Sequence, residues 1–128
     1  MNVRYKELLG LEVTVDDVVY MPSMDAPEDR PFPFVYYITI HNKGPIPVTV
    51  KARKWVVTQA DRQVIVVEGD GVVGQFPRLE PGEEFTYNSC HTIAIDSVAT
   101  GAYFVETDAG EVFAVLIPPF ALELPQWV

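Results

Sequence analysis

Cysteine is nearly absent from this sequence of 128 residues, in which Cys90 is the only one. A single thiol cannot form an intramolecular disulfide, so packing alone must hold the fold together. Such cysteine usage is typical of proteins in a reducing compartment. Long apolar runs are also absent, because charged residues interrupt the first twenty positions and leave no signal-peptide core or membrane span. We therefore expect a cytoplasmic protein that does not insert into membranes.

Basic residues are lacking in the last part of the chain. All nine Lys and Arg lie at or before Arg78, whereas eight of the eighteen acids follow it, and the net charge is −9. Sequence-independent binding to nucleic acid needs Lys and Arg that displace counterions from phosphates. Nucleic acid is therefore not an expected partner.

The apolar residues occur in short runs rich in Val, Ile, Tyr and Phe, separated by Gly, Pro, Asn and Asp. They show no helical periodicity, and their spacing is typical of a β-sandwich or barrel. We predict a single all-β domain over residues 1–128, an immunoglobulin or fibronectin type III-like sandwich of about seven strands in two sheets. The predicted strands are 11–20, 34–41, 48–58, 63–68, 84–91, 102–107 and 111–117.

Glycine and proline mark the connections between these strands. Residues 108–110 end in a Gly, which supplies the positive φ that a tight hairpin needs. Pro81-Gly82 has the residue order of a type II turn. Residues 22–33 hold four of the eleven prolines, so we expect a long exposed loop there.

Side-chain alternation predicts which face of a strand is buried. Alternate residues of the segment 34–41 share one face, which we assign to the core: Phe34, Tyr36, Ile38 and Ile40. In the next strand, Trp55 falls on the face opposite to that of Val50. A β-bulge near Arg53-Lys54 would turn Trp55 inward, because one extra residue flips the side chains that follow it.

Residues 69–74 read Gly-Asp-Gly-Val-Val-Gly and match the GxGxxG pattern of dinucleotide-binding turns. In those folds the pattern opens a helix whose N-terminal amides hold a pyrophosphate. Here two prolines follow and acids surround the motif, which disfavours both a helix and a phosphate. We interpret Gly69, Gly71 and Gly74 as glycines of a sharp loop. The alternative function is a nucleotide or pyrophosphate-binding protein that uses this loop.

The residues suggest neither a metal site nor a catalytic set. Candidate metal ligands are His41, Cys90 and His91, but neighbours on a strand point to opposite faces, so Cys90 and His91 cannot easily share one ion. We expect a buried Cys90 and surface histidines. For the same geometric reason Ser89, Cys90 and His91 do not make a nucleophile and its base. We assign no catalytic residue, metal or cofactor, and we expect a protein that is not an enzyme.

Two features favour contacts with another protein. The run 51–54 is the one positive patch, and alternation would put Lys51 and Arg53 on one face. That face is either an ordinary solvated one or a docking surface for an acidic partner or a second copy. In the apolar tail 118–128, Trp127 is the better interface candidate because large aromatics anchor interfaces. We expect an unidentified protein partner, docked there or at a strand edge, and a weak homodimer that dissociates with salt.

Three stretches of the sequence resemble the ApaG family of small bacterial proteins. They are YYITIHNKGPIPVTVKARKW (Tyr36 to Trp55), EGDGVVGQFPRLEPGEEFTYNS (Glu68 to Ser89) and GAYFVETDAGEVFAVLIPPFAL (Gly101 to Leu122). Together they cover most of residues 36–122 in the right order. Departures are local: the residues before Phe34 match poorly, and Ser97 and Ala99 stand where the family more often has Gly and Met.

The resemblance implies a fibronectin type III-like sandwich, in agreement with the strand pattern. Bacterial members have been linked genetically to cobalt resistance and magnesium efflux, and eukaryotic copies in F-box and DNA-polymerase-interacting proteins look like protein-interaction modules. The resemblance therefore implies a non-enzymatic interaction domain that affects metal efflux indirectly.

Overall fold

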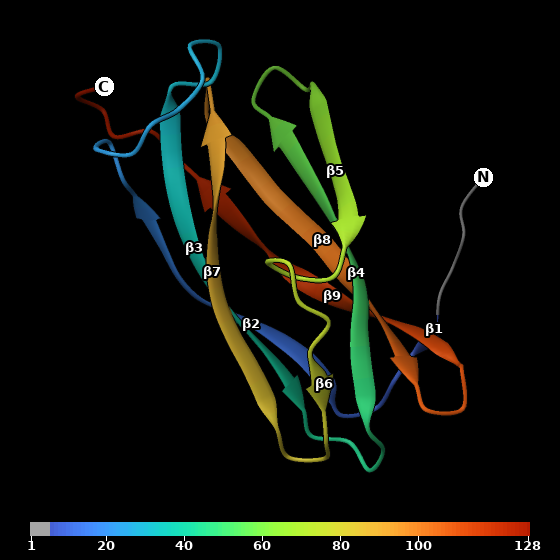
Figure 1. The fold of residues 1–128 in the computed structure, drawn as a ribbon. Coiled ribbons are helices and arrows are strands. Elements are labelled where there is room, and N and C mark those ends of the chain that lie inside the picture. Colours follow the sequence, from blue (N-terminus) through green and yellow to red (C-terminus); the bar gives the residue numbers. More distant parts are fainter. Residues whose placement is uncertain (1–5) are drawn as a thin grey trace.

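The computed structural model describes residues 6–128 as nine strands in two sheets (Figure 1). The strands are β1 (Lys6–Glu7), β2 (Leu11–Tyr20), β3 (Phe32–Asn42), β4 (Val48–Gln59), β5 (Val64–Asp70), β6 (Arg78–Leu79), β7 (Glu84–Ile93), β8 (Ser97–Thr107) and β9 (Val112–Leu122). One sheet has the order β1-β9-β8-β4-β5 with β6 also paired to β4, and the other has the order β2-β3-β7. None of the described residues belongs to a helix long and apolar enough to span a membrane. The predicted all-β sandwich is confirmed.

All seven predicted strands are present, but several of their ends differ from the prediction. β8 begins at Ser97 instead of residue 102, and β9 runs to Leu122 instead of residue 117. β3 begins at Phe32, so the loop predicted over residues 22–33 ends slightly earlier. The two strands that were not predicted, β1 and β6, are two residues long and therefore show no alternation.

The core lies between the two sheets and follows the predicted face of β3. Phe34, Tyr36, Ile38 and Ile40 are all buried. Trp55 of β4 is buried against them, with its ring centroid 4.8 Å from that of Tyr36. Burial of these large apolar side chains is the main stabilising contribution in a fold without a disulfide.

A β-bulge turns Trp55 inward, as predicted, but it lies nearer the start of β4. The pairing of β4 with β8 shifts register between Val50 and Ala52, which leaves Lys51 as the extra residue. Beyond the bulge the alternation is reversed, so Arg53 points to the same inner side as Trp55. The prediction that Lys51 and Arg53 share one face is therefore wrong.

The two predicted tight turns are confirmed. Gly110 has a φ of +86° in the β8–β9 hairpin. Gly82 has a φ of +89°, and the Glu83 amide donates to the Glu80 carbonyl at 2.9 Å, as a type II turn requires.

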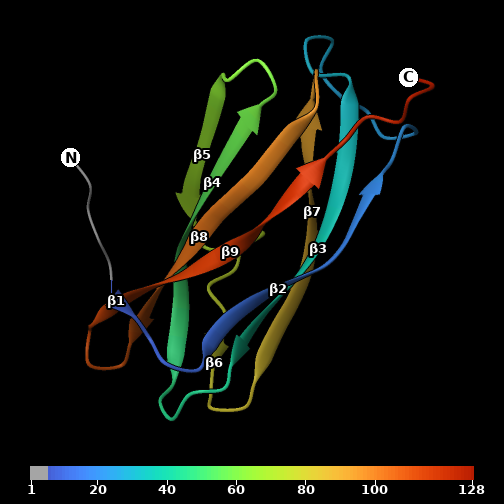
Figure 2. The same cartoon turned by 180° about the vertical axis from the view of Figure 1, so that it is seen from behind.

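The sandwich is closed along one side and open along the other. Figure 2 shows β2 beside β9, where the two sheets meet. On the opposite side the edge strands are β5 of the larger sheet and β7 of the smaller one, and they stand apart (Figure 1). Residues of β4 and β5 and of β3 and β7 line a cavity on this side.

Candidate functional site

A cavity of about 290 Å³ lies on the open side of the sandwich, between the inner faces of β4 and β5 and those of β3 and β7. Polar groups reach it from both sheets and from the loop before β3: Arg30, Tyr36, Arg53, Ser89, His91 and Thr92. None of the described lining residues is an Asp or a Glu. Two arginines without a carboxylate favour a negatively charged occupant over a cation.

Arg53 is held in a fixed position at the floor of this cavity. Its Nη1 donates to the backbone oxygens of Asp70 at 2.8 Å and Gly71 at 3.1 Å. The guanidinium lies against Gly69, where a Cβ atom would come within 2.8 Å of it. Gly69 lies within β5 and packs against this guanidinium, so its interpretation as a loop glycine is wrong.

Three buried tyrosines surround the inner end of Arg53. Burial raises the pKa of Tyr36, Tyr87 and Tyr103, and the positive charge of Arg53 opposes that rise for each of them. The hydroxyls of Tyr87 and Tyr103 hydrogen-bond to each other across the two sheets. Because a buried hydroxyl needs a partner, this bond ties β7 to β8 behind the cavity.

His91 of β7 reaches the cavity between two aromatic rings. Its ring centroid lies 4.8 Å from that of Tyr36 and 4.7 Å from that of Trp55. Burial lowers the pKa of the His91 imidazole to about 4. Its Nε2 atom is buried, and no described residue gives it a hydrogen-bond partner. Such an atom normally has a water or a ligand as its partner.

Cys90 and His91 point to opposite faces of β7, as predicted, but their exposure is the reverse of the prediction. Cys90 is exposed, whereas most of His91 is covered. The alternation of β7 explains this, because Tyr87 and Ile93 are buried and His91 shares their face. The predictions of a surface His91 and a buried Cys90 are therefore wrong.

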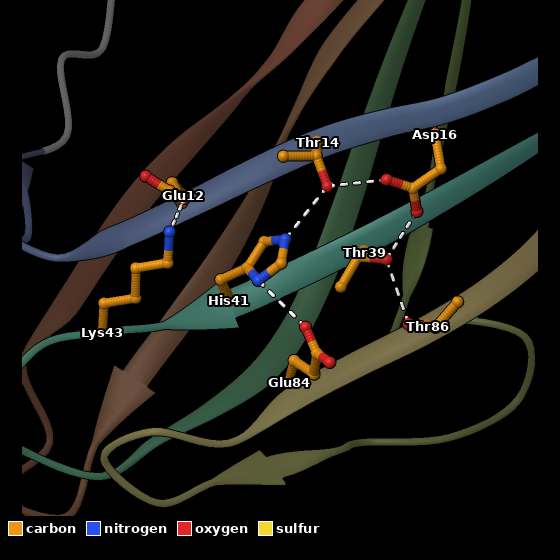
Figure 3. A network of polar contacts seen from close by, with 8 residues as sticks. All are labelled: Glu12, Thr14, Asp16, Thr39, His41, Lys43, Glu84 and Thr86. Carbon is orange, nitrogen blue, oxygen red and sulfur yellow. Dashed lines mark hydrogen bonds and ion pairs between the residues drawn. The ribbon is translucent and has the colours of Figure 1, made fainter.

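The other candidate ligand, His41, lies on the outer face of the smaller sheet in a closed polar network (Figure 3). Its Nδ1 is 3.0 Å from a carboxylate oxygen of Glu84, and its Nε2 is 3.0 Å from the hydroxyl of Thr14. Asp16 accepts hydrogen bonds from Thr14 at 2.9 Å and from Thr39 at 2.5 Å. Both ring nitrogens thus have partners, which gives the network a structural role in joining β2, β3 and β7.

Metal ligands do not gather elsewhere in the part of the chain that the structure describes. Within residues 6–128, no three His, Cys, Asp or Glu side chains are placed to hold one ion.

The GxGxxG segment forms the end of β5 and a tight turn rather than the start of a helix. Val72 and Gln75 exchange backbone hydrogen bonds of 2.8 and 2.9 Å around Val73 and Gly74. These two central residues have φ angles of +44° and +77°, as in a type I′ turn. The interpretation of Gly74 as a turn glycine is confirmed.

The amides of this segment are already used within the chain. The Gly71 amide donates to the Lys51 carbonyl at 2.8 Å, and the amides of Val72 and Gln75 bond to each other's carbonyls. Gly71 has a φ of +62°, and a Cβ there would come within 2.3 Å of the Gln75 oxygen. A pyrophosphate would find few free amides here, so this loop does not resemble a phosphate cradle.

The remaining residues predicted to bind a partner lie apart from the cavity. Lys51 sits over the Phe76 ring, with Nζ 5.9 Å from the centroid. Trp127 is 77% exposed, and its ring centroid is 6.1 Å from that of Tyr20. The weak homodimer stays a prediction that rests on Lys51 and Trp127, and sedimentation at two salt concentrations would test it.

A second candidate surface, which the sequence analysis did not single out, is the edge strand β5. Among the described strands, only β4 pairs with β5. Gln59 donates its amide to Gln63 across the hairpin, and the alternation of an antiparallel ladder then directs the backbone groups of Val64, Val66 and Glu68 away from β4. Large apolar side chains are exposed along this edge and the following loop: Val64, Val66, Val67, Val73 and Phe76. The run of β-branched residues 64–67 could have indicated this apolar strand in the sequence.

Comparisons with known proteins agree with this architecture. The sequence pattern of the ApaG domain matches residues 22–107. Protein ApaG of Stenotrophomonas maltophilia is 40% identical over 108 residues, which are 84% of this chain and 85% of that protein. A crystal structure of a Bordetella pertussis protein named ApaA is 33% identical, with a TM-score of 0.78, and the match covers 96% of this chain and 99% of that one. An X-ray structure from a structural genomics consortium is 31% identical, with a TM-score of 0.81 and coverage of 93% and 90%. This chain therefore belongs to the ApaG domain family.

Proposed function

We propose that this protein is a non-enzymatic interaction domain that binds a protein partner along the edge strand β5. The observation that supports this function best is the unprotected character of that edge. Natural proteins shield edge strands with Lys, Pro or a bulge, because an open ladder invites another strand to pair with it. β5 has the sequence VIVVEGD, which contains neither Lys nor Pro, and no register shift interrupts its pairing with β4.

The chemistry of the β5 edge favours a partner that offers an extended segment with apolar side chains. An extended segment of another protein would pair with the outward backbone groups of β5 and place its own apolar side chains beside Val64 and Val66. Glu68 and Asp70 end the strand with negative charge, although Lys54 lies 3.7 Å from Glu68. A basic residue at the matching end of the partner segment would complement the remaining charge. An effect on cobalt or magnesium efflux would then pass through this partner.

Substitution of Val66 by Lys tests the proposal. Val66 is 52% exposed on β5, and a lysine there opposes strand addition because the charge must be desolvated. We expect Val66→Lys to weaken binding about tenfold or more, the effect of losing roughly 1.4 kcal/mol. Partners are captured from cell extract at low and moderate salt, and the Kd of the purified pair is then measured.

The matched control is Val112→Lys, which introduces the same charge at a valine of similar exposure. Val112 is 45% exposed at the start of β9, on the side of the larger sheet that lies away from β5. It should retain the partner with an unchanged Kd. Equal binding by Val66→Lys and the unchanged protein would contradict docking at β5. Failure to enrich any partner above a bait of matched surface charge would contradict the interaction function itself.

A further inference from the structure

The charged residues that line the cavity on the open side of the sandwich are positive, whereas the protein as a whole is negative. The chain carries eighteen acids against nine Lys and Arg, yet both charged residues in the cavity lining are arginines. The carboxylate of Asp29 is 4.0 Å from Arg30 Nε, but it is 82% exposed and does not line the cavity. Glu68 and Asp70 pair with Lys54 and Ala52, so they lie on the outer face of the larger sheet. The local potential in the cavity is therefore positive.

Contacts within the protein hold Arg53 and the His91 ring in place at this cavity without a ligand. Arg53 uses only Nη1 in its bonds to Asp70 and Gly71, which leaves its other guanidinium nitrogens outside those bonds. The Nε2 atom of His91 is buried without a partner in the described structure, and the rings of Tyr36 and Trp55 hold the imidazole in place. The fixed guanidinium of Arg53 is therefore a preorganised donor in this small cavity, and the His91 ring forms part of the cavity wall.

We propose that this cavity is a binding site for a small oxyanion, a phosphate or carboxylate group, held by Arg53 and Arg30. The guanidinium of Arg53 supplies fixed charge-assisted hydrogen bonds. Arg30, in the loop before β3, adds positive charge to the cavity lining. Ile65 and Val67 of β5 line this site, whereas the proposed partner pairs with the outward backbone groups of Val64, Val66 and Glu68, so anion binding does not require that partner.

The volume of the cavity limits the size of the molecule that carries the oxyanion. A cavity of about 290 Å³ is at the lower limit of the usual size for small-molecule sites. The ligand is therefore a small metabolite or a single acidic group rather than a nucleotide. Apolar residues of β4 and β5, Val57, Ile65 and Val67, complete the lining and contact the carbon part of such a ligand.

The proposal is tested by NMR titration of the ¹⁵N-labelled full chain with inorganic phosphate and, in a second arm, with acetate. Ionic strength is held constant with sodium chloride so that screening does not change. We expect saturable shifts centred on Arg53 and on His91, which lines the same cavity. The phosphate and acetate arms identify which oxyanion the site prefers. Absence of saturation by both anions up to about 50 mM would overturn the proposal.

Three variants locate the binding. Arg53→Gln and Arg30→Gln should each lower affinity about tenfold, because each removes a charged hydrogen-bond donor to the anion. Arg30 lies in the loop before β3, so Arg30→Gln remains informative if Arg53→Gln loosens the end of β5. Arg62→Gln, in the exposed turn between β4 and β5, removes the same charge and should bind like the unchanged protein. Equal losses in Arg62→Gln and Arg53→Gln, or unchanged affinity in Arg30→Gln, would overturn the assignment.

Discussion

Acidification from about pH 7.5 to about pH 5 is expected to lower the free energy of unfolding by about 2 kcal/mol through His91 alone. The loss should reach about 3 kcal/mol near pH 4. Burial lowers the pKa of His91 from 6.5 to about 4 in the folded chain. At a pH between these two pKa values, His91 is mostly protonated in the unfolded state and mostly neutral in the folded state. Stability is therefore complete above the unfolded pKa and falls as the pH decreases toward the folded one.

The surroundings of the His91 imidazole explain why its pKa is lowered. The rings of Tyr36 and Trp55 flank it at 4.8 and 4.7 Å, and Arg53 and Arg30 line the same cavity. No described carboxylate lines that cavity, so a protonated His91 would lack a counter-charge.

Urea unfolding at several pH values measures the effect. His91→Phe should show a flatter dependence of the unfolding free energy on pH between about 4 and about 6.5, because it removes the titrating group. His41→Gln is the control, since His41 lies in the outer network with Glu84 and Thr14. A slope in His91→Phe equal to that of the unchanged protein would show that His91 is not responsible.

The alternation of β3 predicted its buried face because that strand is regular. β3 is the central strand of the smaller sheet, and its pairing with β7 continues from Phe32 to His41 without a register shift. A period of two therefore maps directly onto the inner and outer faces. Glycine at a turn is equally local, which is why the turns at Gly82 and Gly110 were predicted from the sequence alone.

The position of Arg53 could not be read from local alternation because it depends on pairing between distant strands. The register shift between Val50 and Ala52 is set by how β4 fits β8. A signal was nevertheless present in Trp55. Once that large aromatic is assigned to the core, Arg53 must point inward as well unless a bulge separates the two residues. A bulge near Arg53-Lys54, as predicted, would separate Arg53 from Trp55, so the prediction placed Arg53 on the outer face.

The exposure of Cys90 and His91 was mispredicted because average residue preferences were applied to individual positions. Free cysteine is among the most buried residue types, and histidine is intermediate. In β7, however, Tyr87 and Ile93 are the large side chains that have to be covered, and the alternation carries His91 with them. The cavity therefore contains a histidine that residue preference alone assigns to the surface.

Replacement of Gly101 by Ala is expected to lower the free energy of unfolding by about 3 kcal/mol. Gly101 lies in the central strand β8, opposite Trp55 of β4. A Cβ at this position would come within 2.0 Å of the Lys54 carbonyl oxygen and 3.2 Å of the Trp55 Cα. Both are backbone atoms, so no side-chain rotation relieves the overlap and the two strands must separate. Chemical denaturation at neutral pH measures the loss.

Gly110→Ala separates this overlap from the general cost of replacing glycine. Gly110 has a φ of +86°, but no atom lies within 4 Å of the position of its added Cβ. Its replacement should cost about 1 to 2 kcal/mol, from backbone strain alone. Because Gly101 supports the backbone of Trp55, Gly101→Ala should also change the NMR shifts of the His91 ring, which Trp55 contacts, whereas Gly110→Ala should leave them unchanged. Equal destabilisation by the two variants, with an unchanged His91 ring, would show that β4 and β8 tolerate the extra methyl group.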